Sequence, residues 1–228
     1  GGDKRYISRF QLDASTLDRY NFVEVGYSDE HDLNMAAGDK DLVRFMKDMR
    51  KVLDASVTTE LDWQLYQLQR KYLDYQVNIG NRIIEVLQSG EPDAAERAQK
   101  ISEPKKKFQD LVDKLFAETG KRLVRTKNEI LFSQIGEELT PYQLSSGEKQ
   151  LLAILLTVLT EDNQHYVLFM DEPEVSLHID WQQKLIEMIL DLNPNVQIIL
   201  TTHSPAVIMN GWMDKVTEVS DIVVGDNQ

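Results

Sequence analysis

Two adjacent carboxylates, Asp171 and Glu172, directly follow a short apolar run at Tyr166–Met170. An uninterrupted apolar run of this length is typical of a strand that is buried on both faces of a parallel sheet. Open α/β sheets hold their ligands at the carboxyl ends of such strands. Because neighbouring strand residues point to opposite faces, the pattern predicts two tasks: one carboxylate serves a metal ion, and the other faces a reacting water. An acidic strand end that only opens a turn at Pro173 explains this stretch equally well.

A second candidate site is the helix start at Ser145–Glu148. Ser145 and Glu148 have the spacing of a capping box, in which each side chain satisfies a backbone N–H group of the first turn. Gly147 lets a ligand approach the backbone, and a helix N-terminus favours negative charge. The run Leu151–Leu159 is apolar nearly all round, which predicts a buried helix. A capping box alone is common, so without its neighbours this stretch would indicate only a helix start.

A third stretch repeats the pattern of a strand followed by a polar residue. Val196–Thr201 predicts a second buried strand, and His203 lies just beyond its carboxyl end. Ser204 and Pro205 suit the N-cap and the first position of a helix. A lone histidine at such a place is more often structural than catalytic, but here it shares a sheet edge with the two carboxylates.

Together the three stretches resemble the C-terminal half of an ABC-type P-loop ATPase, of the kind found in SMC and RecF-like proteins and in the AAA-like ATPases of OLD-type systems. Leu144–Glu148 matches the signature motif, Val167–Glu172 the Walker B strand, Glu174–His178 the D-loop region and His203 the switch histidine. The resemblance covers roughly the last half of the chain, and the order and spacing of the motifs make it specific.

The resemblance implies a role for each matched residue. Asp171 would hold Mg²⁺ through its water shell, Glu172 would polarise the attacking water, and His203 would sense or stabilise the γ-phosphate of ATP. Signature motifs act across a head-to-tail dimer, so the residues that would contact ATP held by a second subunit are Ser145, Ser146, Gly147 and Glu148.

The signature motif departs from the common Leu-Ser-Gly-Gly-Gln pattern. Ser146 replaces the first glycine and Glu148 replaces the glutamine, and such variants resemble the SMC and RecF-like branch more than the membrane transporters. His178 ends the D-loop region where transporters usually have Asp, so it could be structural or a dimer contact.

A complete ATPase of this kind needs the phosphate-binding loop Gly-x-x-x-x-Gly-Lys-Ser/Thr, and the chain has no such run. Gly38–Asp41 and Gly147–Gln150 both lack its glycine spacing and its hydroxyl. In the family this loop comes near the N-terminus, and the chain opens with Gly1 rather than Met. We therefore expect a fragment or processed chain whose loop is supplied elsewhere; natural loss of the loop is the alternative.

Composition limits the classes of partner. The chain has 228 residues, enough for one good core and a smaller second unit, and a net charge of −13 from 38 acidic and 25 basic residues. This charge argues against a broad nucleic-acid-binding face, which needs clustered Lys and Arg. The absence of cysteine excludes disulfides and cysteine-based metal sites. No apolar run approaches membrane-spanning length and no signal peptide is visible, so we expect a cytoplasmic protein without membrane contact.

The coarse element pattern predicts an α/β fold with a mainly parallel P-loop NTPase sheet and an inserted helical hairpin or subdomain. We expect a remnant of the N-terminal ATPase lobe over 1–38, a helical insertion over 39–120 and the C-terminal ATPase lobe over 121–228. Strands are expected in the first part near Lys4–Leu12 and Asn21–Tyr27, and in the last part near Lys121–Arg125, Glu129–Ser133 and Ile222–Val224. The insertion contains a helix near Glu60–Gln88 with a heptad-like seam, and a returning helix that Pro104 is expected to break or kink. The hairpin could take up a partner or only pack on the sheet.

Three functions remain open from the sequence. The first is an ATPase using ATP and Mg²⁺ as a head-to-tail dimer, coupled to a partner or nucleic-acid transaction of the DNA-repair or anti-phage-defence type, with a nuclease or DNA as a candidate partner. The second is a non-catalytic module that activates a partner ATPase. The third, weaker, is a metal-dependent nuclease using Asp171 and Glu172.

Overall fold

The computed structural model describes residues 6–8, 21–25 and 56–221, with side chains from residue 56 onward. By its contacts the chain divides into unit 1, Gly1–Tyr27 with Asn163–Gln228, and unit 2, Ser28–Asp162. The three-part division expected from the sequence stays a prediction; in the structure, residues 121–162 group with the helical hairpin. The helix expected beyond residue 39 and the last expected strand, Ile222–Val224, lie outside the described residues.

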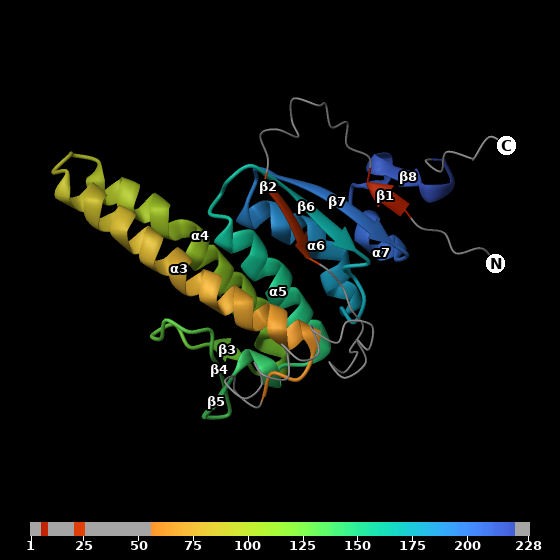
Figure 1. The fold of residues 1–228 in the computed structure, drawn as a ribbon, viewed down its shortest axis with the longest axis horizontal. Helices are drawn as coiled ribbons and strands as arrows, with labels where there is room; N and C mark the ends of the chain where they lie inside the picture. Colours follow the sequence, from red (N-terminus) through yellow and green to blue (C-terminus); the bar gives the residue numbers. More distant parts are fainter. Residues whose placement is uncertain (1–5, 9–20, 26–55, 222–228) are drawn as a thin grey trace, which may run out of the picture. The chain divides into compact units, whose positions relative to one another are not determined.

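Unit 1 is built on a five-stranded sheet in the order β2-β6-β7-β1-β8 (Figure 1). Its strands are β1 Tyr6–Ser8, β2 Asn21–Val25, β6 Tyr166–Asp171, β7 Val196–Thr202 and β8 Val216–Glu218. Strands β2, β6 and β7 pair in parallel, whereas β1 runs antiparallel to both β7 and β8. The predicted α/β class with a parallel sheet at its centre is confirmed, and both strands expected near the N-terminus join the same sheet.

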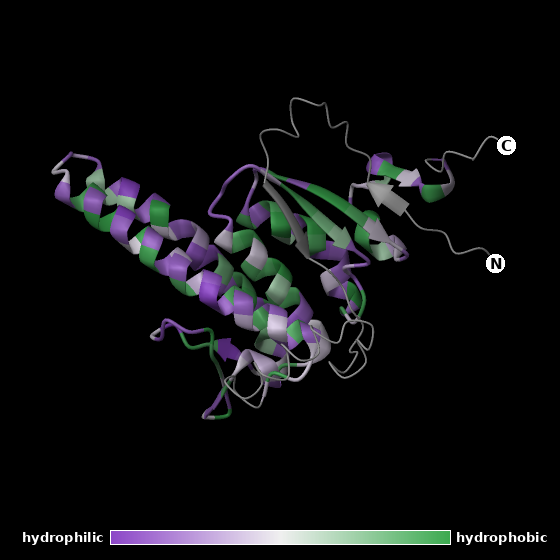
Figure 2. Ribbon diagram, in the orientation of Figure 1, coloured by the Kyte–Doolittle hydropathy of each residue, from purple (hydrophilic) through white to green (hydrophobic). Residues whose placement is uncertain are grey.

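The buried apolar runs explain why β6 and β7 are central strands. The first three residues of β6 are fully buried, and β7 alternates between buried and half-buried positions. The hydropathy colouring shows the same apolar character along both strands (Figure 2). A parallel pair needs a crossover connection, and here helix α6 Ile179–Leu192 provides it with a buried apolar face. The short helix α7 Pro205–Ile208 follows β7, and its N-cap is Ser204 as expected.

Unit 2 contains the predicted helical hairpin, made of α3 Glu60–Gln88 and α4 Ala94–Phe116 (Figure 1). Thr59 and Asp62 form a capping box at the start of α3. At about 1.5 Å per residue the 29 residues of α3 extend for about 44 Å. The predicted seam is confirmed in part, because its buried members on α3 are Leu65, Tyr72, Tyr75 and Ile79.

Pro104 does not break α4, which continues through it as one helix. Proline removes one intrahelical hydrogen bond and crowds the preceding turn, at a cost of about 3 kcal/mol. The residues beyond it compensate by packing: Phe108, Val112 and Phe116 are almost completely buried. The Phe108 ring lies 6.2 Å from the Tyr72 ring of α3. Tertiary contacts therefore override the local break signal.

A small antiparallel sheet lies in the chain between the hairpin and the helix that begins at Ser146. Its strands are β3 Arg122–Leu123, β4 Phe132–Gln134 and β5 Glu137–Leu139, in this order. The sequence predicted the first two near these positions but not β5. Helix α5 Ser146–Thr160 follows and is buried along nearly its whole length, as the apolar run predicts. Among the described residues, no helix is long and apolar enough to cross a membrane.

Candidate functional site

Asp171 is the last residue of β6, and its register partner on β7 is Thr201. The hydroxyl of Thr201 donates a hydrogen bond to Asp171 Oδ1. The Asp171 side chain is exposed, so a carboxylate and a hydroxyl oxygen lie together at the carboxyl end of the sheet. Hard cations such as Mg²⁺ prefer oxygen ligands of this kind.

Glu172 leaves the strand in a left-handed conformation, with φ of 46°. Non-glycine residues adopt this region at an energetic cost, and such positions concentrate at functional sites. Two bonds to Thr201 hold the backbone here: the N–H of Glu172 donates to the Thr201 carbonyl oxygen at 3.0 Å and to its Oγ1 at 3.3 Å. The turn redirects the chain, so Glu172 does not continue the alternation of β6.

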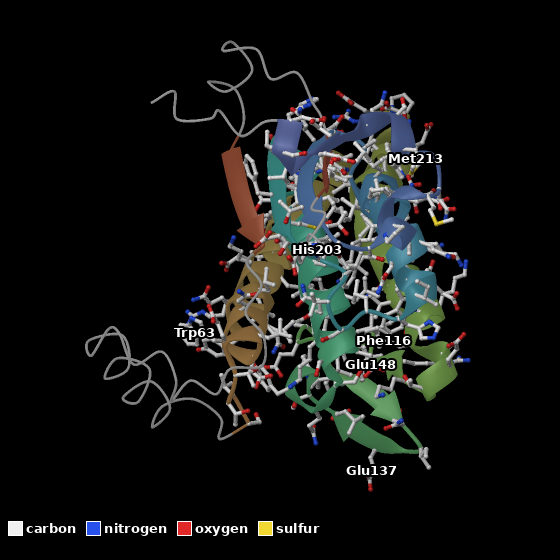
Figure 3. All side chains as sticks on the ribbon, turned by 90° about the vertical axis from the view of Figure 1, so that its right-hand side faces the viewer. Trp63, Phe116, Glu137, Glu148, His203 and Met213 are labelled. Carbon is white, nitrogen blue, oxygen red and sulfur yellow. The ribbon has the colours of Figure 1, made fainter. Side chains whose placement is uncertain are left out.

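The Glu172 carboxylate contacts His203, which is labelled in Figure 3. His203 Nε2 lies 2.7 Å from Glu172 Oε1, and the two side chains are 29% and 32% exposed. The contact joins residues 31 positions apart in the chain, from the ends of two adjacent parallel strands. The structure thus brings the predicted carboxylates and histidine of unit 1 to one edge of the sheet.

His178 has a structural task in this unit. It is the N-cap of α6, and its Nδ1 accepts a hydrogen bond of 3.4 Å from the backbone N–H of Asp180. This satisfies one of the free N–H groups at a helix start. Of the two roles left open by the sequence, the structure shows the structural one, and a dimer contact stays a prediction.

Ser145 and Glu148 of unit 2 form the predicted capping box. Ser145 is the N-cap of α5; its N–H donates to Glu148 Oε2 at 2.9 Å, and its Oγ accepts from the Glu148 N–H at 3.4 Å. Ser145 is exposed and Ser146 half-buried, whereas Gly147 is buried. The expected contact of these residues with ATP of a second subunit stays a prediction.

Glu148 has partners that the sequence analysis missed. Its residue is 1% exposed, and Oε1 accepts from Thr119 Oγ1 at 2.7 Å and from Lys121 Nζ at 2.9 Å (Figure 3). Burial acts against ionisation, but the bonds from Thr119, Ser145 and Lys121 outweigh it, so the pKa of Glu148 lies below its usual value. The carboxylate is thus engaged within unit 2, although the resemblance assigned it to ATP.

A second buried ion pair links α5 to the start of α3. Lys149 Nζ lies 2.8 Å from Asp62 Oδ1, and the Asp62 side chain is fully buried. Burial raises the pKa of Asp62, but the hydrogen bonds from Lys149 and from the backbone N–H groups of Thr58 and Thr59 prevail and lower it. No sequence signal pairs these residues, which lie on helices far apart in the chain.

The Asp62 pair predicts an acid-sensitive contribution to stability. Because the pKa of folded Asp62 lies below its ordinary value of 3.8, the ionised pair stabilises the fold above that pH, and the contribution is lost as the pH falls through the folded pKa. We expect Asp62→Asn to lower the free energy of unfolding in urea at about pH 7, and the difference from wild type to shrink at about pH 3. A difference that does not change with pH would contradict this assignment.

Comparison with known proteins gives one family match and several partial relatives. Residues 26–210 match the family described as "AAA domain, putative AbiEii toxin, Type IV TA system". The chain is 30% identical over 98 residues to "Retron Vc95 probable ATPase" from Vibrio cholerae serotype O1 biovar El Tor, covering 38% of this chain and 19% of that protein. It is 32% identical over 97 residues to "Retron Ec83 probable ATPase" from Escherichia coli, covering 38% and 18%.

A third relative is "Septu protein PtuA" from Bacillus thuringiensis, which is 30% identical over 93 residues, covering 35% of this chain and 24% of that protein. The chain therefore spans between 18% and 24% of the length of these curated relatives.

Proposed function

Because the chain belongs to the AAA-domain family described as "putative AbiEii toxin, Type IV TA system", we propose that it supplies catalytic and dimer-forming parts of an ABC-type ATPase. The observation that carries this proposal is the contact between Glu172 and His203 beside Asp171, at the carboxyl end of parallel strands. The retron proteins named as probable ATPases, 30% and 32% identical to the chain over the matched stretches, support the same activity.

The residues at the sheet edge fit a magnesium ion. Asp171 would hold it, directly or through water, and the Thr201 hydroxyl lies beside that carboxylate. When bound with ATP, Mg²⁺ neutralises charge on the phosphate oxygens. Among the described residues no cluster of three or more potential metal ligands occurs, which suits an ion held largely by water and phosphate.

Glu172 and His203 would act on the water and on the phosphate, respectively. The Glu172 carboxylate would accept a hydrogen bond from the attacking water and orient it, as general bases do within hydrogen-bond reach. In the structure His203 Nε2 faces the Glu172 carboxylate. With ATP bound, this single N–H would donate toward the γ-phosphate instead, which leaves Glu172 to bind the water. The left-handed backbone at Glu172 fixes where its carboxylate can reach, which supports a positioning role.

The signature residues would act on a second subunit. The α5 N-terminus presents Ser145 and Ser146, and a helix start favours the negative charge of a phosphate. In a head-to-tail dimer, each ATP lies between the Asp171–Glu172 edge of one subunit and the signature motif of the other. The phosphate-binding loop would come from another part of the complete protein or from a partner.

Complementation between two inactive variants tests this arrangement. Glu172→Gln removes the base but keeps the signature motif, whereas Ser146→Arg blocks the signature motif but keeps the base. In a mixed head-to-tail dimer one of the two sites is then intact, so equal mixing should restore roughly a quarter of the wild-type ATPase rate. Sedimentation velocity with and without ATP reports dimer formation in parallel.

The outcomes separate the proposals. A mixture that stays as inactive as the two single variants, although ATP-dependent dimers form, would contradict a site shared between subunits. A complete protein that neither binds nor hydrolyses ATP, yet activates a partner ATPase through Ser146, would indicate the non-catalytic module instead.

For the biological task, we propose a partner or nucleic-acid transaction of the DNA-repair or anti-phage-defence type, with a nuclease or DNA as the partner. The similarity to a Septu protein and to retron ATPases favours anti-phage defence.

A further inference from the structure

Glu174 is a buried carboxylate that none of the tasks above uses. It lies in the turn between β6 and α6, and only 7% of the residue is exposed. Its Oε1 accepts three hydrogen bonds from the end of β7 and the loop after it: from Thr202 Oγ1 at 2.5 Å, from the His203 N–H at 2.9 Å and from the Ser204 N–H at 3.1 Å. One oxygen of Glu174 thus binds the backbone N–H groups of two consecutive residues, His203 and Ser204.

The second oxygen, Oε2, is buried and has no hydrogen-bond partner among the described residues. A buried carboxylate with one oxygen unsatisfied is costly, because no hydrogen bond compensates for the loss of water at that oxygen. Charge-assisted bonds to backbone N–H groups are about twice as strong as neutral ones, which favours a carboxylate where a loop must be fixed tightly. The arrangement therefore suits a residue that keeps the His203 loop rigid better than one that only adds to the stability of the fold.

The same turn holds the other end of this loop. The N–H of Glu172 donates to Thr201, so residues 201–204 are tied at their start by Glu172 and at their end by Glu174. Gln182 of α6 adds a brace: its Nε2 donates to the Leu177 carbonyl oxygen at 2.9 Å, and its Oε1 accepts from Ser204 Oγ at 2.7 Å. Hydrogen bonds therefore connect the turn at residues 172–177 to the loop at residues 202–204, so that the two segments are held together.

We propose that Glu174 is a positioning residue that sets the 2.7 Å contact between His203 Nε2 and Glu172 Oε1. It acts through the backbone of residues 202–204 and does not itself touch substrate. The inference rests on the proposed ATPase function, because the contact that it sets is the one assigned to catalysis. Sequence reasoning missed it, although a third carboxylate two positions after Glu172 was a visible signal.

Two substitutions of different severity test the proposal in the complete protein. Glu174→Gln keeps an acceptor oxygen and places its amide where Oε2 finds no partner, so the loop stays tied by weaker bonds. Glu174→Ala removes all three bonds. We expect kcat for ATP to fall by about 10-fold in the Gln variant and by about 100-fold in the Ala variant, with KM changed less than about 3-fold, since misplacement of about 1 Å costs rate more than binding. Glu187→Ala, an exposed carboxylate on α6, is the matched control and should leave kcat unchanged.

The imidazole resonances of His203, assigned with His203→Gln, give a readout independent of hydrolysis. We expect these resonances to shift in both Glu174 variants and to stay at wild-type values in Glu187→Ala. Unshifted resonances with a wild-type kcat in Glu174→Ala would overturn the proposal; if that variant does not fold, the same result in Glu174→Gln would do so. A wild-type protein without ATPase activity would refute the proposed function, whereas shifted His203 resonances would still support the positioning role.

Discussion

Glu172→Gln is expected to lower the ATP hydrolysis rate of the complete protein by about 10²–10⁴-fold, the usual contribution of a positioned general base. The amide keeps the size of the side chain but accepts a proton far less readily than a carboxylate. Because the 2.7 Å contact with His203 is replaced by a neutral hydrogen bond, the backbone of the turn should stay in place. A coupled assay of phosphate release measures the rate.

Nucleotide binding provides the control for this substitution. We expect Glu172→Gln to bind MgATP at least as well as wild type. It should accumulate as an ATP-bound dimer, because the proposed dimer closes around ATP before hydrolysis occurs. Asp214→Asn is a matched exposed acid outside the site and should hydrolyse ATP normally. An unchanged rate in Glu172→Gln would remove this residue from the chemistry and favour the non-catalytic module.

The sequence predicted the elements whose signals are local. The apolar runs gave β6 and β7 within one residue, and α3 has the predicted ends at Glu60 and Gln88. The capping box of Ser145 also formed as predicted, because its two partners lie within one helical turn. The sequence also predicted that His203 lies at the same sheet edge as Asp171 and Glu172, because parallel strands end at one edge; it did not predict the strand order.

Side-chain partners distant in sequence could not be predicted in the same way. The bond of Thr201 to Asp171 depends on the exact strand register, and the burial of Asp62 depends on how α3 meets α5. Pro104 was expected to break or kink a helix that tertiary packing keeps continuous. For Pro104 the local preference is about 3 kcal/mol, which a few buried contacts override.

The partners of Glu148 could not be predicted from the sequence either, and substitution of this residue has the largest expected effect on stability. Its motif position resembles a residue that contacts ATP, yet its carboxylate is held by Lys121, Thr119 and the Ser145 backbone. The Glu148 and Lys121 side chains are only 2% and 11% exposed, so the pair is removed from water. Breaking a buried pair from one side leaves the other charge without compensation, which costs more than the pair itself contributes.

We therefore expect Glu148→Ala to lower the free energy of unfolding by about 3–5 kcal/mol, because it leaves the buried Lys121 charge without a partner and removes half of a capping box. Urea unfolding followed by circular dichroism measures this change, and Glu137→Ala, on the exposed face of β5, should differ from wild type by less than about 0.5 kcal/mol. A double variant distinguishes the cost of the unpaired Lys121 charge from the cost of the lost capping box. Glu148→Leu with Lys121→Met should recover part of the lost stability, since no buried charge then lacks its partner. A loss below about 1 kcal/mol in Glu148→Ala would mean that water reaches Lys121 and that the pair is a surface contact. A large loss that the double substitution partly reverses would assign most of the cost to the buried Lys121 charge without its partner, rather than to the lost capping box.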